Sequence, residues 1–234
     1  MIIIPARLAS TRFPRKILVD IDGLPMVIRS AKLALSVDDT IIACDDAETL
    51  KVCENFGVKA VMTSQNHASG TDRISEACKI LGLSDFETVI NLQADEPFLE
   101  KKVLADFVKF TKNQNSDFVM TSAYKSVSEK DAECPNLVKV VLNSTNHAIY
   151  FSRAKIPFDR DGGFKNYLGH LGLYGFNVKS LSKFCELNAS ELENIEKLEQ
   201  LRAISNSLPI AMLKVETSSF GIDTPSDLSK ALLR

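Results

Sequence analysis

The first half of this chain alternates short apolar segments with longer amphipathic segments, and this rhythm constrains its fold more than any other feature. Predicted strands cover residues 2–4, 40–44, 58–62, 88–92 and 118–123, and predicted helices cover 25–35, 46–56, 71–81 and 101–112. Strands separated by single helices and short connections are typical of a parallel sheet with helices on both faces. We therefore expect an α/β fold built on a mostly parallel, twisted, Rossmann-like sheet.

The pattern changes after about residue 125. Residues 137–142 and 147–151 resemble two antiparallel strands, and a loop rich in Asp and Gly follows at 159–164. Further strands are predicted at 171–176 and 210–215, and further helices at 178–185, 192–205 and 226–233. No repeat or linker interrupts the sequence, so we expect residues 1–234 to form a single domain with a small antiparallel lobe at 137–168.

Composition excludes several classes of protein. The chain has 234 residues, 45% of them hydrophobic, which is enough for a sizeable core. Its formal net charge of -2 provides no basic field for nucleic acid. The apolar run at residues 1–5 is too short for a signal peptide or a membrane span. We expect a cytoplasmic protein with no membrane insertion and no nucleic-acid partner.

The loop after the first strand concentrates positive charge. Arg7, Arg12, Arg15 and Lys16 lie in this one connection together with Ser10. Ligands of open α/β sheets bind at the carboxyl ends of strands, and Arg and Lys are the side chains that hold phosphate oxygens. A triphosphate needs several such partners, so the loop predicts a triphosphate site, with a solvated basic turn as the alternative. Neither a P-loop nor a dinucleotide fingerprint is present.

Two acidic residues follow predicted strands. Asp95 comes soon after the buried strand that ends at Leu92, and Asp223 lies between the last strand and the last helix. Carboxylates at the edge of a sheet, together with phosphate oxygens, are ligands that Mg²⁺ prefers. Each acid also has an alternative role as a helix cap, which Thr224 could equally fill for the last helix.

Two further segments carry polar side chains that could contact a ligand. Ser69 to Arg73 opens a helix, where free backbone N–H groups and hydroxyls could recognise a base or a ribose, although an ordinary capped helix would look the same. Period two in a strand places His170, Gly172 and Tyr174 on one face. A lone His is usually structural, so this face stays ambiguous on its own.

The helix around residues 193–202 carries Glu196, Glu199, Gln200 and Arg202 beside an apolar stripe. Taken alone, these polar residues are most simply a solvated helix face with i,i+3 pairs.

Together these segments closely resemble the 3-deoxy-manno-octulosonate (Kdo) cytidylyltransferase family. The matching motifs are residues 3–14, 69–71, 95–97, 150–154, 156–157, 170–172, 198–202 and 223–225. They occur in order and span nearly the whole chain, which makes the set specific although each motif alone is weak. The resemblance implies a nucleotidyltransferase fold and the transfer of CMP from CTP to Kdo with Mg²⁺, for lipopolysaccharide synthesis. It also implies a homodimer formed through the lobe at 137–168.

The resemblance also implies roles for individual residues. The implied catalytic residues are Lys16, Arg12, Asp95 and Asp223, and the two acids would hold Mg²⁺. The implied nucleotide-binding residues are Arg7, Ser10, Arg12, Lys16, Ser69, Gly70, Thr71 and Arg73. The implied sugar-site residues are Gln93, His170, Tyr174, Glu199 and Gln200, with Arg153 supporting the site or meeting the sugar carboxylate.

Three features depart from the family pattern. Arg15 and Ala94 stand where the family usually has glycine, and the segment at 159–168 is shorter than usual. Two other readings compete: a CMP-sialate synthetase or another sugar nucleotidyltransferase, and a nucleotide-binding module without catalysis. The motifs at 170–174 and 198–202 favour Kdo, and the retention of Lys16 with both acids argues against a module that has lost catalysis.

Overall fold

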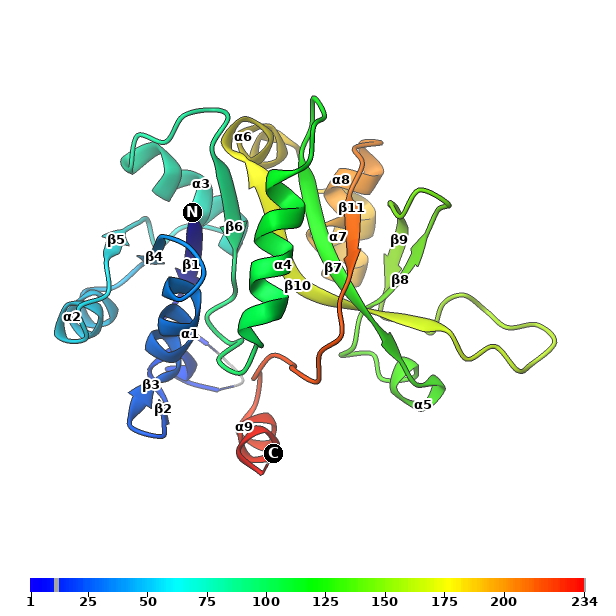
Figure 1. The fold of residues 1–234 in the computed structure, drawn as a ribbon, viewed down its shortest axis with the longest axis horizontal. Helices are drawn as coiled ribbons and strands as arrows, with labels where there is room; N and C mark the ends of the chain where they lie inside the picture. Colours follow the sequence, from blue (N-terminus) through cyan, green and yellow to red (C-terminus); the bar gives the residue numbers. More distant parts are fainter. Residues whose placement is uncertain (11–12, 234) are drawn as a thin grey trace.

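The computed structural model, which describes residues 1–10 and 13–233, is organised around one twisted sheet (Figure 1). Seven strands run across it in the order β11-β7-β10-β6-β1-β4-β5, and β8 and β9 extend it from β10. These strands are β1 (Ile2–Ala6), β4 (Thr40–Cys44), β5 (Ala60–Met62), β6 (Thr88–Asn91), β7 (Met120–Val127), β8 (Lys139–Leu142), β9 (Ala148–Ser152), β10 (Tyr167–Asn177) and β11 (Ala211–Lys214). A separate hairpin consists of β2 (Asp20–Ile21) and β3 (Leu24–Pro25).

Along the seven-strand path, four of the six neighbouring pairs are parallel, as predicted for a mostly parallel sheet. β1 pairs in parallel with β4 and β6, β4 with β5, and β11 with β7. The long strand β10 runs antiparallel between β6 and β7. β8 and β9 form the expected antiparallel pair, with Lys139 opposite Ser152. The predicted α/β fold and its small antiparallel region are therefore confirmed.

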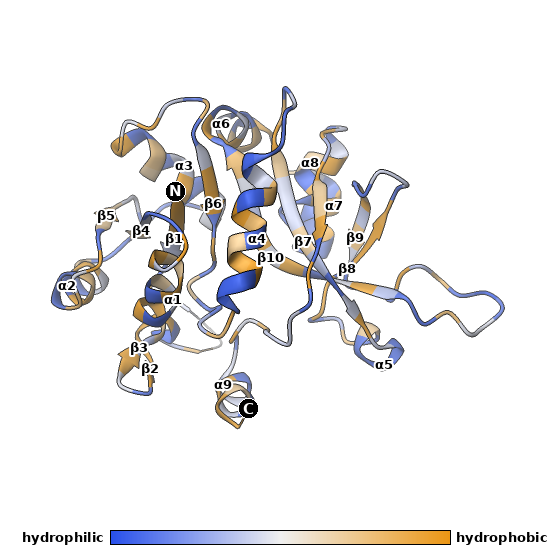
Figure 2. Ribbon diagram, in the orientation of Figure 1, coloured by the Kyte–Doolittle hydropathy of each residue, from blue (hydrophilic) through white to orange (hydrophobic). Residues whose placement is uncertain are grey.

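Helices cover both faces of the sheet. They are α1 (Met26–Leu35), α2 (Ala47–Asn55), α3 (Gly70–Ile80), α4 (Lys101–Lys112), α5 (Glu129–Ala132), α6 (Val178–Glu186), α7 (Glu191–Glu196), α8 (Leu201–Ser205) and α9 (Pro225–Leu232), with a 3₁₀ turn, η1, at Lys16–Leu18. Ile2 and Ile4 of β1 pack in one core with α1 and α4, whereas Ile3 packs in a second core with α3 and α6. Figure 2 shows a largely hydrophobic β1 at the centre of this arrangement and helices, such as α4, that carry both hydrophilic and hydrophobic residues.

The helix predicted at 192–205 is broken into α7 and α8, which corrects the prediction. Lys197 ends α7 in the left-handed conformation, with φ 54°. The Arg153 Nε–H donates to the Glu196 carbonyl at 2.7 Å, at the end of that helix. The break turns the following segment toward the core, where Leu198 and Leu201 are buried.

Polar side chains cap the first turns of α2 and α3. Asp46 caps α2 by accepting a hydrogen bond from the Thr49 N–H at 2.8 Å. Helix α3 begins at Gly70, one residue before the predicted start at residue 71, because Ser69 is its N-cap and Asp72 completes a capping box. None of the helices in the described ranges combines the length and apolar character needed to cross a membrane.

Candidate active site

Lys16 joins the two acids that the sequence singled out. Its Nζ lies 2.6 Å from Asp95 Oδ2 and 2.9 Å from Asp223 Oδ1. Lys16 comes from η1, Asp95 follows β6, and Asp223 precedes α9, so three distant parts of the chain meet here. Burial opposes the charge on Lys16, but the two carboxylates, Asp95 above all, outweigh it and raise the pKa of Lys16 above its ordinary value.

The helix-cap alternatives for these acids are wrong. The N-cap of α9 is Thr224, which forms a capping box with Asp227, and the N-cap of α4 is Glu100. Asp95 and Asp223 instead pair with Lys16. Since neither acid caps a helix, ligand binding is the predicted role that remains for them.

Backbone contacts hold the two acidic segments together. The Ile222 N–H donates to the Asp95 carbonyl at 2.9 Å, and Ser219 Oγ donates to Glu96 Oε2 at 3.1 Å. Burial, followed by the charge of Asp95, raises the pKa of Glu96 to about 8. A protonated Glu96 would add no further negative charge to the two neighbouring carboxylates. Glu96, which directly follows Asp95, could from the sequence have capped the next helix, but the N-cap of α4 is Glu100.

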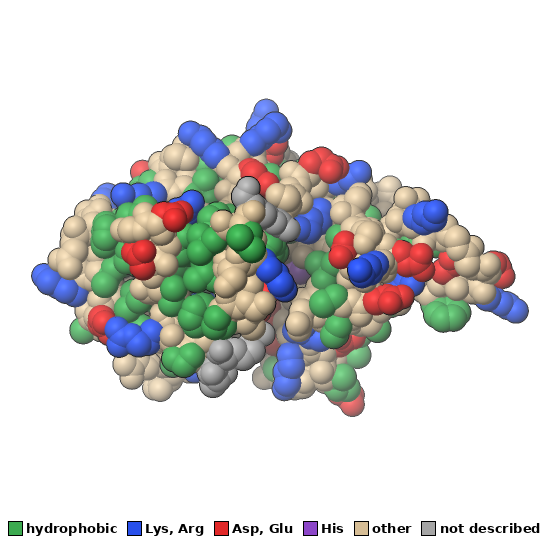
Figure 3. All heavy atoms as spheres, turned by 90° about the horizontal axis from the view of Figure 1, so that it is seen from below, with side chains coloured by type: hydrophobic (Ala, Val, Ile, Leu, Met, Phe, Trp, Pro, Cys, Tyr) green, Lys and Arg blue, Asp and Glu red, His purple; other side chains and the backbone are tan. Residues whose placement is uncertain are grey.

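The opening loop lies at the same edge of the sheet. Arg7 is exposed and Ser10 is half-buried, so both can meet a ligand; Arg12 lies outside the described residues. Figure 3 views this edge from below and shows Lys and Arg side chains around a hollow between the two halves of the molecule. Arg15 is in the left-handed region at φ 57°, and its guanidinium pairs with Glu48.

The start of α3 uses its side chains for contacts within the protein. Gly70 lies so close to β1 that a Cβ added there would be 3.1 Å from Pro5 Cγ. Thr71 Oγ1 donates to Glu199 Oε1 at 2.8 Å, which places its hydroxyl beside a predicted sugar-site residue. The Arg73 guanidinium is 2% exposed and bound to Asp45. The side chains of Thr71 and Arg73 are therefore engaged within the protein, although the sequence grouped both residues with the nucleotide contacts.

The predicted sugar-site residues gather on one side of the sheet. His170 and Tyr174 share a strand face, with ring centroids 5.6 Å apart, although a bulge interrupts β10 between Leu171 and Tyr174. The Tyr174 hydroxyl donates to Gln200 Oε1 at 3.0 Å. Gln93 lies next to Gly172, and its Nε2 donates to the buried Asn91 at 3.0 Å. The sequence analysis missed Asn91, which is a polar residue in an otherwise apolar strand.

Burial sets the protonation of this cluster. Desolvation lowers the pKa of His170 to about 3, so its imidazole is neutral near pH 7 and hydrogen-bonds with Ser122 at 2.8 Å. Burial raises the pKa of Tyr174, which stays a phenol, and burial also raises the pKa of Glu199. A ligand of this cluster would therefore be bound through hydrogen bonds rather than through a positive charge on His170.

Two atoms of the cluster have no hydrogen-bond partner among the described residues. They are Glu199 Oε2, which is an acceptor, and Gln200 Nε2, which is a donor. A buried polar atom without a partner costs about 1–3 kcal/mol, which a polar ligand would relieve. Gln200 itself is 2% exposed, so the expectation of a solvated helix face here is wrong.

Arg153 is held by backbone oxygen atoms. Its Nε–H donates to the Glu196 carbonyl at 2.7 Å, and its NH1 donates to the Pro135 carbonyl at 3.1 Å. Of the two roles implied for Arg153, these contacts favour support of the segment that leads to Glu199. Arg202 is buried and pairs with Glu193 at 2.6 Å.

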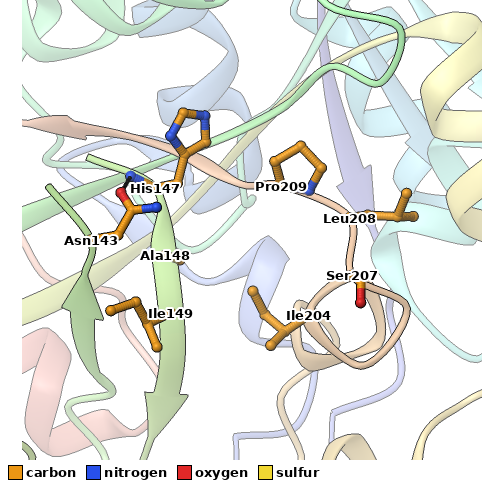
Figure 4. A pocket seen from close by; sticks show the side chains of 8 residues that line it. All are labelled: Asn143, His147, Ala148, Ile149, Ile204, Ser207, Leu208 and Pro209. Atoms are coloured by element: carbon orange, nitrogen blue, oxygen red, sulfur yellow. Dashed lines mark hydrogen bonds between the residues drawn. The ribbon is translucent and has the colours of Figure 1, made fainter. Parts of the chain in front are cut away.

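An open pocket lies away from these residues. It has a volume of about 400 Å³ and lies between the β8–β9 hairpin and the segment after α8. Figure 4 shows Ile149 and Ile204 facing one another across it, with His147 at its rim. None of the predicted site residues lines this pocket, so it does not belong to the candidate active site.

Comparisons with known proteins place this architecture in a class. A cytidylyltransferase family model matches residues 1–213. The inositol-1-phosphate CTP transferase from T. maritima shares the fold at a TM-score of 0.66 and 16% identity, covering 99% of this chain and 92% of that one. Fold and site together define an α/β nucleotidyltransferase.

Closer relatives give the family. The 3-deoxy-manno-octulosonate cytidylyltransferase of Wolinella succinogenes is 53% identical over 238 residues, which cover 99% of this chain and 98% of that protein. The Helicobacter pylori enzyme of the same name is 53% identical and covers 99% and 96%. A structure of CMP:2-keto-3-deoxy-manno-octonic acid synthetase complexed with CTP has a TM-score of 0.92 at 35% identity, covering 99% and 97%. The chain belongs to the 3-deoxy-manno-octulosonate cytidylyltransferase family.

The conformation of Arg15 yields a prediction. A left-handed backbone costs a residue with a Cβ about 1–2 kcal/mol, and glycine avoids that cost. We expect Arg15→Gly to raise the free energy of unfolding by up to about 1 kcal/mol and to leave the KM for CTP unchanged. The matched control is Arg15→Ala, which also removes the guanidinium but keeps the strain. A similar rise in the KM for CTP in both variants would show that the guanidinium grips phosphate.

Proposed function

We propose that this chain transfers CMP from CTP to the anomeric hydroxyl of Kdo and releases pyrophosphate. The observation that carries the proposal is the convergence of Lys16, Asp95 and Asp223 at the carboxyl edge of the sheet. The opening loop reaches the same edge, and Gln93, two residues before Asp95, borders both Gly70 at the start of α3 and Gly172 in β10. Nucleotide and sugar acid would therefore meet beside the charged cluster.

The reaction needs positioning and charge neutralisation more than covalent catalysis. The acceptor hydroxyl oxygen attacks the α-phosphorus, and the bond from that phosphorus to the bridging oxygen of the pyrophosphate breaks. Arg7, Ser10 and Lys16 would bind the triphosphate, and Lys16 would stabilise charge on the leaving pyrophosphate. Arg12, outside the described residues, would join them by resemblance.

Asp95 and Asp223 suit Mg²⁺. Two carboxylates that already share one cation are hard oxygen donors, and Mg²⁺ typically takes one or two carboxylates plus phosphate oxygens. When bound, Mg²⁺ would neutralise phosphate charge and make the acceptor hydroxyl more acidic. Lys16 would then be free to follow the phosphates, because the metal would take its place as the counter-charge of the acids.

The sugar side would be held by hydrogen bonds. Glu199 Oε2 and Gln200 Nε2, which lack protein partners in the described chain, would pair with hydroxyl groups of the sugar. Gln93, His170 and Tyr174 would complete this wall, whereas Arg153 would position the segment that carries Glu199. On this assignment a sialic acid, with different substituents, would leave some of these groups unpaired.

We also propose that residues 1–234 act as a single domain, since one sheet joins nine strands that lie between Ile2 and Lys214. The cytoplasmic location inferred from the sequence stays a prediction.

The substrate assignment is tested by pyrophosphate release. With Mg²⁺ and Kdo, we expect activity with CTP to exceed activity with ATP or GTP strongly, because the chain belongs to a cytidylyltransferase family. Sialic acid and a reaction without acceptor serve as controls. Equal rates with all triphosphates, or activity with sialic acid instead of Kdo, would overturn the assignment.

The metal assignment is tested by Asp95→Asn and Asp223→Asn. We expect each to lower kcat by about a hundredfold or more, the scale of losing one electrostatic stabiliser. The Asp223 side chain is 46% exposed and Lys16 keeps its other partner, so the free energy of unfolding should change by less than about 1 kcal/mol. Asp106→Asn, which alters a surface pair with Lys102, is the matched control. Near-normal turnover of Asp223→Asn at saturating Mg²⁺ would reject the assignment.

The dimer is a separate proposal. The lobe at 137–168 exposes large apolar side chains, with Ile149 54% and Phe158 87% exposed, and a partner subunit would cover them. We expect light scattering at micromolar concentration to give the mass of two chains, and Phe158→Ser to shift the mass toward one chain. A monomer for the unmodified chain would contradict the proposal.

A further inference from the structure

Asp45 ties the opening loop to the start of α3. It follows β4 directly, and its Oδ1 accepts a hydrogen bond from the Leu8 N–H at 3.1 Å. Its Oδ2 accepts from the Arg73 guanidinium at 3.0 Å. The side chains of Arg73 and Asp45 are only 2% and 8% exposed, so this ion pair is buried. The Asp45 carboxylate therefore joins two segments, which are the loop after β1 and the helix α3 that follows β5.

Arg73 is itself fixed by further contacts. Its NH1 donates to Thr63 Oγ1 at 2.7 Å and to the Ser64 carbonyl at 3.0 Å. With acceptors on three residues, the guanidinium cannot turn toward a ligand without leaving Asp45 as an unpaired buried charge, which is costly. Arg73 is thus a brace for Asp45, and not a group that is free to bind the nucleotide.

The two braced segments meet at the edge where the nucleotide would bind. Leu8 lies two residues beyond β1, between Arg7 and Ser10. The first residue of α3, Gly70, packs against Pro5 in β1, two residues before the exposed Arg7 of the loop. Asp45 therefore determines the spacing between the phosphate-binding loop and the helix start at which the base would lie.

We propose that Asp45 is a positioning residue for CTP, which holds the loop at Leu8 and the start of α3 in their binding geometry before the nucleotide arrives. This inference rests on the proposed function, because it takes CTP as the ligand of this edge. A loop that is already ordered loses less conformational entropy when it binds, so pre-organisation raises affinity without any new contact.

The chemistry of Asp45 makes the inference testable by an isosteric change. Both of its partners, the Leu8 N–H and the Arg73 guanidinium, are donors, so the residue must supply two acceptor oxygens. A carboxylate has two, whereas an amide has one acceptor and one donor. In Asp45→Asn the amide oxygen would stay on Arg73, and the NH₂ group would face the Leu8 N–H and release the loop.

The test compares Asp45→Asn with Asp46→Asn. The control removes the same charge one residue away, where Asp46 only caps α2 and Asn caps about as well. We expect Asp45→Asn to raise the KM for CTP about tenfold, the effect of losing one buried hydrogen bond, with the KM for Kdo and kcat within about twofold of the unmodified chain. Asp46→Asn should leave all three unchanged.

Equal KM values for CTP in the two variants would overturn the proposal. A fall in kcat together with a rise in the KM for both CTP and Kdo in Asp45→Asn would overturn it as well. If the unmodified chain makes no CMP-Kdo, the proposed function fails, and calorimetric titration of CTP into the same variants still decides the role of Asp45. If Asp45→Asn does not fold, the amide of Leu8 in the unmodified, nucleotide-free chain is measured by NMR hydrogen exchange. Slow exchange supports the brace, and exchange at the rate of a free loop amide overturns it.

Discussion

The ion pair network of Lys16 with Asp95 and Asp223 is the interaction on which the rest of the site depends. Two carboxylates brought together without a cation would repel each other, and one of them would take up a proton. Lys16 supplies that cation at 2.6 and 2.9 Å, and the acids in turn keep Lys16 charged despite its burial. In the proposed function, the same three groups would provide two oxygen ligands for the metal and a cation for the phosphates of the triphosphate.

The sheet brings these groups together because the strands that carry them are parallel. β1 and β6 are neighbours, so the loop after Ala6 and the segment after Asn91 emerge at the same edge. Alternation along β1 places Ile2 and Ile4 in one core and Ile3 in the other, and helices on both faces lock the strand in place. The edge is therefore rigid beneath a polar surface, and Asp45 at the end of the neighbouring strand β4 extends that rigidity to the opening loop.

The sequence predicted the strands of the sheet and the position of Asp95, because both follow from local hydrophobic patterns and from the geometry of parallel strands. For Asp223 the sequence left two roles open, metal ligand or helix cap, because Asp223 and the adjacent Thr224 were equally good candidates for the cap. Only the folded structure shows that Thr224 caps α9. The break at Lys197, the bulge in β10 and the burial of Arg202 also depend on tertiary partners that no local pattern contains. Asp45 follows a buried strand as Asp95 does, so the signal for it was present, but its partner Arg73 was grouped with the nucleotide contacts.

The most direct test of this account is a crystal structure of the chain with CTP and Mg²⁺. The account predicts a metal ion between Asp95 and Asp223, with Lys16 Nζ moved from the carboxylates to a phosphate oxygen of the nucleotide. A structure in which Lys16 still bridges both acids while the metal and the triphosphate are held elsewhere would contradict it.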